Sequence, residues 1–158
     1  MLNRKRVWRG RRGFSLIELL IVIAIILIII TMAVPKFTQS RKFANEVSAV
    51  RSLQTINSAQ VQFQSVYGRY ATSLTELGPS SSGAPSPSGA ELISGDLSAG
   101  EKGGYKFSMA GSEAGYQVHA NPDIFKTTGD RTFFTDQNMV IRQNFGQEPA
   151  SASSAEFK

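Results

Sequence analysis

The clearest pattern in the chain is a mostly apolar run from Phe14 to Val34, in which Glu18 is the only charged residue. A helix of these 21 residues, rising about 1.5 Å per residue, reaches about 31 Å and matches the thickness of a hydrocarbon core. Apolar side chains would surround its whole circumference, so it has no polar face for lying in a membrane interface. We therefore predict a transmembrane helix over residues 14–34.

An amphipathic pattern follows from Pro35 onward. Pro35 removes one backbone hydrogen bond, so we predict a kink or a loosening of the helix there. Beyond it, apolar residues recur at helical spacings, which predicts a helix that ends near Tyr67 with Gly68 as a left-handed C-cap. The apolar stripe is expected to pack on a sheet and consists of Phe43, Val47, Val50, Leu53, Ile56 and Phe63. The opposite face is expected to carry Arg41, Lys42, Glu46, Arg51, Gln54 and Gln60.

After residue 104 the apolar period changes from helical to two, which is typical of strands. We predict an antiparallel sheet of about four strands, one face of which covers the apolar stripe. The fold class is therefore α+β: a long N-terminal helix, transmembrane in its first half, packed on a small antiparallel sheet. The expected strands are Tyr105–Met109, Tyr116–Ala120, Thr132–Thr135 and Met139–Arg142, with hairpin loops over 111–115 and 136–138.

Three further segments complete the organisation of the chain. Thr72 or Ser73 with Glu76 forms a capping-box pattern, which predicts a short helical turn. Residues 79–104 are dense in Ser, Gly and Pro, so we expect a surface loop that buries no core. Residues 146–158 are polar, and we expect a flexible tail.

Charge is distributed very unevenly along the chain. Six of the seventeen basic residues precede Gly13. The other eleven basic residues and all twelve acidic residues follow it. The charge therefore gives no reason to expect a nucleic-acid partner. Basic residues ahead of an apolar span indicate the cytoplasmic side of a membrane. We predict a cytoplasmic leader over 1–13, a membrane helix over 14–34, a globular domain over 35–145 and the tail over 146–158.

The position of the small residues decides between two kinds of cleaved N-terminus. A secretory signal has an apolar core of roughly 7–15 residues followed by a small-residue cleavage site. Here the core is longer, and the residues around Ala33 make a poor site. Gly13 instead precedes the core, and a residue without a side chain lets an extended backbone approach a protease closely. A cut there would leave the membrane helix on the mature protein.

The segment Arg12–Glu18, with the sequence RGFSLIE and a long aliphatic run after it, resembles the leader and cleavage motif of type IV pilins and type II secretion pseudopilins. The resemblance extends from Arg11 to Pro35. It implies that a prepilin peptidase cleaves between Gly13 and Phe14 and methylates the new Phe14 amine. It also implies three kinds of partner: copies of this chain, related pilins or pseudopilins, and an inner-membrane assembly platform.

Glu18 is an unusual residue within a helix of membrane-spanning length, because its carboxylate is costly to place in lipid. An unpaired carboxylate at mid-membrane costs about 2.5–3.5 kcal/mol on insertion scales. The positive Phe14 amine of a neighbouring helix, shifted by about one turn, would lie near the same depth and recover part of that cost. We therefore hypothesise that Glu18 sets the register of neighbouring subunits. The alternative is a tolerated acid that reaches toward water at the membrane face.

Candidates for other chemistry are few. The chain has no cysteine and one histidine, His119, which the strand pattern places on the solvent side. Neither a histidine pair for a metal nor a convincing Ser-His-Asp arrangement can be built, so we do not expect an enzyme or a resident cofactor. Asp123, Asp130 and Asp136 lie in two neighbouring loops and are weak candidates for a calcium site, which some pseudopilins carry in this region. Solvated loop acids are the simpler interpretation.

Three functions are compatible with this organisation. The protein is expected to be a structural subunit of a type IV pilus-like filament, or alternatively a pseudopilin that acts in type II secretion. It would first span the inner membrane once and then enter an extracellular pilus or a periplasmic pseudopilus. A membrane-tethered binding module is the third and less favoured hypothesis, and it predicts no cleavage at Gly13.

Overall fold

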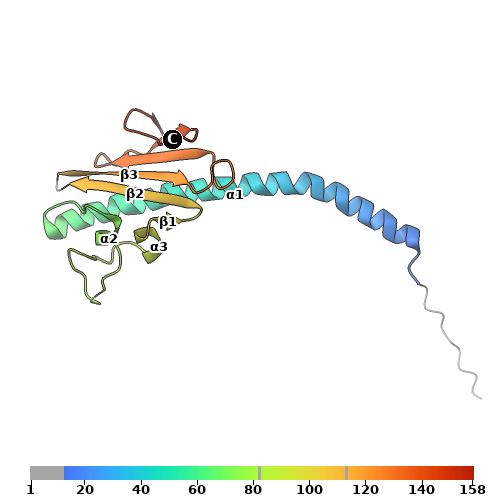
Figure 1. Cartoon of the computed structure of the whole chain (residues 1–158), viewed down its shortest axis with the longest axis horizontal. Helices are drawn as coiled ribbons and strands as arrows, with labels where there is room; N and C mark the ends of the chain where they lie inside the picture. Colours follow the sequence, from blue (N-terminus) through green and yellow to red (C-terminus); the bar gives the residue numbers. More distant parts are fainter. Residues whose placement is uncertain (1–12, 82, 113) are drawn as a thin grey trace, which may run out of the picture. The chain divides into compact units, whose positions relative to one another are not determined.

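The computed structural model describes residues 13–81, 83–112 and 114–158, so the expected leader over 1–12 lies outside the described residues. The described chain forms two units that meet between Phe37 and Thr38. The elements in chain order (Figure 1) are α1 (Leu16–Tyr67), α2 (Leu74–Leu77), α3 (Gly95–Ser98), β1 (Glu101–Lys102), β2 (Tyr105–Ser112), β3 (Gly115–Pro122), β4 (Arg131–Asp136), β5 (Arg142–Phe145) and β6 (Ala155–Glu156).

The first unit contains the start of α1, whose apolar side chains are exposed from Phe14 to Val34. Among the described residues, α1 is the one helix long and apolar enough to cross a membrane by length and composition. Pro35 lies inside α1, which continues through it without a break in the helix. The kink expected at Pro35 stays a prediction.

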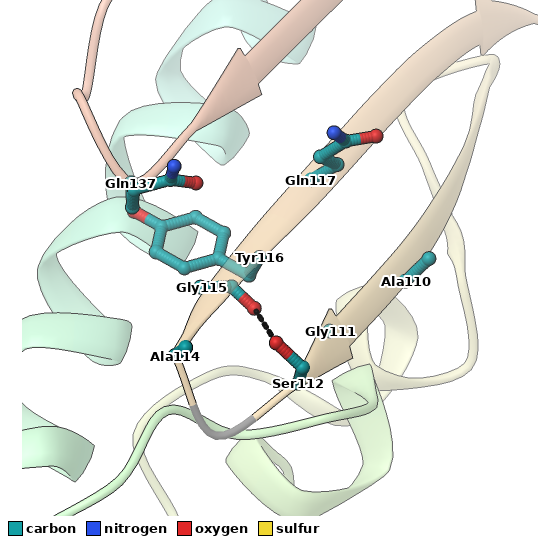
Figure 2. A pocket seen from close by; sticks show the side chains of 8 residues that line it. All are labelled: Ala110, Gly111, Ser112, Ala114, Gly115, Tyr116, Gln117 and Gln137. Carbon is teal, nitrogen blue, oxygen red and sulfur yellow. Dashed lines mark hydrogen bonds between the residues drawn. The ribbon is translucent and has the colours of Figure 1, made fainter.

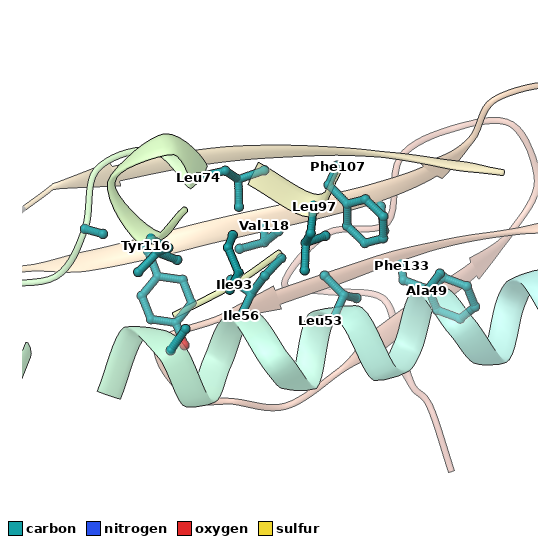
Figure 3. Packing of buried hydrophobic residues seen from close by; sticks show 14 of the residues in the cluster. Ala49, Leu53, Ile56, Leu74, Ile93, Leu97, Phe107, Tyr116, Val118 and Phe133 are labelled. Atoms are coloured by element: carbon teal, nitrogen blue, oxygen red, sulfur yellow. The ribbon is translucent and has the colours of Figure 1, made fainter. Parts of the chain in front are cut away.

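The second unit is built on an antiparallel sheet, as predicted. Its strands follow one another in the order β1-β2-β3-β4-β5-β6, and each pairs antiparallel with its neighbour. The later part of α1 packs on one face of this sheet. Figure 3 shows Leu53 and Ile56 of α1 in the same packed cluster as Val118 of β3 and Phe133 of β4, all of which are buried. The α+β fold class is confirmed.

Burial along α1 confirms the core of the predicted stripe and corrects its edges. Val50, Leu53, Ile56 and Phe63 are buried, whereas Phe43 is exposed. Two residues assigned to the polar face, Glu46 and Gln60, are also buried. Their burial is tolerated because both are hydrogen-bonded: Gln60, for example, donates to the Ala71 carbonyl and accepts from the Ala71 N–H.

The turns at the end of α1 agree with the sequence pattern in most details. Gly68 has a φ of 74° and donates its N–H to the Gln64 carbonyl, as a left-handed C-cap does. Glu76 of α2 accepts hydrogen bonds from the backbone N–H and the hydroxyl of Thr72. The capping interaction therefore uses Thr72, while Ser73 is the N-cap residue by backbone geometry and makes no side-chain cap.

The fourth predicted strand is displaced. Met139–Arg142 was expected to pair with β4, but the strand is β5, which begins at Arg142. Met139 has a φ of 60° and donates its N–H to the Asp136 carbonyl, so it closes a turn after β4. A left-handed residue cannot continue a strand, which explains the shift.

The Ser, Gly and Pro-rich segment over 79–104 is more structured than expected. It contains α3 and β1, and three of its apolar residues, Ala90, Ile93 and Leu97, are buried in the core. Backbone bonds from residues 90–93 to the α2 region, such as Ala90 N–H to the Glu76 carbonyl, hold it in place. The expectation that this segment buries no core was wrong, because its few apolar residues are grouped where the chain returns to α2.

The segment from residue 146 onward also differs from the expected flexible tail. Ala150 is fully buried, and the Glu148 carbonyl accepts hydrogen bonds from Thr132 and Asn144. The chain then forms β6, which pairs with β5. Composition indicated a tail because nine of the thirteen residues over 146–158 are Gly, Pro, Ser, Ala or Gln, yet backbone groups of this segment bond to the sheet.

Candidate functional site

The candidate processing site lies directly before α1. Gly13, Phe14 and Ser15 have no regular secondary structure, and α1 begins at Leu16. Apart from its chain neighbours, no described residue has a heavy atom within 4 Å of the position that a Cβ on Gly13 would occupy, and Phe14 is 82% exposed. Gly13 and Phe14 are therefore both exposed and outside the helix, as a protease needs for an extended substrate.

Glu18 has a contact that the charge argument did not foresee. Its Oε2 accepts a hydrogen bond of 2.8 Å from the backbone N–H of Ser15, just ahead of the first helical residue. This is the carboxylate half of a capping box, in which the third helical residue reaches back to the N-cap. The signal was visible in the sequence as Ser15-x-x-Glu18. The carboxylate also lies near the positive end of the helix dipole, which favours a negative charge.

The three acidic residues considered for calcium each have another partner. Asp123 pairs with Lys106 at 2.6 Å and Asp130 with Lys42 at 3.1 Å. Asp136 accepts hydrogen bonds from the backbone and the side chain of Asn138. Within the described ranges, no three acidic or histidine side chains gather as a metal site would require.

His119 lies on β3 on the sheet face opposite α1, in agreement with the strand pattern, but it is partly buried. Its ring lies 5.1 Å from the ring of Phe134 on the paired strand. A partly buried histidine ring that packs against a phenylalanine of the neighbouring strand is typical of a structural residue. Ser108 of β2 lies opposite His119 in register, but among the described residues the His119 Nδ1 has no hydrogen-bond partner, so it lacks the bonded carboxylate that orients the histidine of a hydrolytic triad.

A surface hollow of about 470 Å³ lies at the end of the β2–β3 hairpin (Figure 2). Small residues line most of it, together with Gln117, Gln137 and Tyr116, and the Ser112 hydroxyl donates to the Gly115 carbonyl across the hairpin. None of its described lining residues is charged.

Two of the four tyrosines are part of the hydrophobic core. Tyr116 is 2% exposed and donates its hydroxyl to Oδ1 of Asn57 on α1. Tyr105 is also buried and donates its hydroxyl to the Arg131 carbonyl. Burial raises the pKa of Tyr116 to about 12 and raises that of Tyr105 still further, so both hydroxyls stay protonated.

A partly buried ion pair at the start of β4 was missed entirely by sequence reasoning. Glu46 of α1 accepts hydrogen bonds from Nε and Nη2 of Arg131, and its other oxygen accepts from the Asp130 N–H. The Arg131 guanidinium also lies over three phenylalanine rings, at 5.4–5.7 Å from their centroids. The partners are 85 positions apart, so no local pattern could have connected them.

An apolar helix that starts beside an open Gly–Phe bond, and then packs on a small antiparallel sheet, defines a pilin-like α+β protein. Residues 8–34 match the family described as the prokaryotic N-terminal methylation motif. Over 67 residues the chain is 39% identical to the type IV major pilin protein PilA of Myxococcus xanthus (strain DK1622). That match spans 42% of this chain and 30% of the relative's length.

The matched N-terminal motif and the similarity to a type IV major pilin support a type IV pilin or pseudopilin family for this chain. Members of this family are structural rather than catalytic proteins.

Proposed function

We propose that this protein is the structural subunit of a type IV pilus-like filament, cleaved between Gly13 and Phe14 and polymerised through its N-terminal helix. The observation that carries the proposal is the RGFSLIE segment, exposed at its Gly–Phe bond and followed at once by the apolar first part of α1. The similarity to a protein named as a type IV major pilin supports the same role.

The exposed first part of α1 explains why such a protein would polymerise. Its large apolar side chains from Phe14 to Val34 are 45–82% exposed, far more apolar surface than a soluble monomer presents to water. Lipid would cover this surface in a single inner-membrane pass with the N-terminus in the cytoplasm. In the filament, the same helices of neighbouring copies, or of related pilins, would cover it, and an inner-membrane assembly platform would transfer each subunit.

Glu18 would select the register in which these helices pack. Cleavage creates a positive amine on Phe14, and the Glu18 carboxylate of a neighbour shifted by about one turn would pair with it. Because an isolated carboxylate in hydrocarbon costs about 2.5–3.5 kcal/mol, one register would be favoured over the others. This role uses helix packing and one ion pair, and it requires no cofactor or metal.

The decisive measurement is the N-terminal residue and the intact mass of the protein from native membranes, with and without the prepilin peptidase. We expect an N-methylated Phe14 that is lost when the peptidase is absent. An unprocessed Met1 in both strains would refute the proposal and favour a membrane-tethered binding module.

A pair of substitutions tests the part assigned to Glu18. Glu18→Gln keeps an oxygen for the Ser15 N–H but removes the charge, whereas Glu18→Ala removes both. We expect both variants to be inserted and cleaved and to fail in filament assembly. Normal filaments from Glu18→Gln would refute pairing with the amine as the source of register.

The second candidate function, a pseudopilin of type II secretion, is supported by the same motif. A deletion strain separates the two. Loss of surface filaments with normal protein export supports a pilus subunit, and loss of export with no surface filament supports a pseudopilin.

A further inference from the structure

We draw no further inference here: the strongest candidate, the surface hollow at the end of the β2–β3 hairpin, carries none, because Ser112 and Ala114 line it on either side of residue 113, which lies outside the described residues, and the described lining selects no class of ligand.

Discussion

Truncating Glu46 to alanine should be among the most destabilising single changes in the second unit. Glu46 is 6% exposed, and its carboxylate accepts hydrogen bonds at 2.9 and 2.6 Å from Nε and Nη2 of Arg131. Its second oxygen accepts from the Asp130 N–H at 2.9 Å. These three bonds fasten α1 to the start of β4, so their loss separates the helix from the sheet at one end.

The size of the effect follows from what the substitution leaves behind. Removing one partner of a buried ion pair typically costs about 3–5 kcal/mol, because the other charge stays buried without compensation. Arg131 would keep a hydrogen bond to Gln143 and its position over three phenylalanine rings. Those contacts favour the lower end of the range, and we expect Glu46→Ala to lower the free energy of unfolding by about 3 kcal/mol.

The assay is urea unfolding of the processed chain in detergent micelles, followed by near-ultraviolet circular dichroism of the core tyrosines. Glu148→Ala is the matched control, since it removes the same charge from an exposed side chain and keeps the backbone carbonyl that Thr132 and Asn144 use. Its effect should stay within about 0.5 kcal/mol. Replacing Arg131 by Met in the Glu46→Ala chain should recover part of the loss, because the uncompensated charge is then gone.

The reasoning is refuted if Glu46→Ala costs less than about 1 kcal/mol, the value expected for a solvated surface pair. It is also refuted if the double substitution is less stable than Glu46→Ala by the full cost of a second truncation. Either result would mean that water, and not Arg131, satisfies the carboxylate.

Three further predictions concern the same unit. Gly103→Ala should lower the free energy of urea unfolding by about 2–3 kcal/mol, because Gly103 has a φ of 60° and a Cβ would lie 2.8 Å from a serine hydroxyl of α1. Gly68→Ala is the control: Gly68 has a φ of 74° but open space around it, so the loss should be only about 1–2 kcal/mol. The unfolding midpoint should fall as the pH rises from 10 to about 12, because the unfolded chain releases the Tyr116 proton near 10.0 while the folded chain holds it to about 12; an unchanged midpoint would contradict the burial of that hydroxyl. Leu53→Ala, at a fully buried position, should cost about 2–5 kcal/mol in a thermal melt, whereas truncation of the exposed Val66 should cost little.

The parts of the fold that could be read from the sequence are those whose burial follows a regular period. The apolar run over 14–34 and the central stripe of α1 fall in this class, as do the three longest strands. Each of these strands was expected within a few residues of its observed bounds, because alternation of apolar and polar residues records which face of the sheet is covered.

The parts that were missed depend on partners far along the chain. The sequence pattern predicts that Glu46 is a surface acid. Its burial depends on Arg131, which lies 85 residues later in the chain and bonds to it in the fold. β6 has two residues and no pattern of its own, and it exists because β5 offers an open edge. Met139 shows a different kind of error. Its apolar side chain fitted a strand pattern, but its left-handed backbone closes a turn.

The candidate site was proposed from a local motif, and the structure adds one contact within it, between Glu18 and Ser15. A carboxylate has two oxygens and about four acceptor sites, and the Ser15 N–H uses one of them. That bond directs Glu18 back toward the start of the helix, the side on which cleavage would create the Phe14 amine. It also holds the Glu18 side chain in one rotamer before assembly. Less side-chain entropy is therefore lost when the carboxylate meets the neighbouring amine. The cap and the proposed contact with a neighbouring amine therefore do not compete: the first would hold the carboxylate in place for the second.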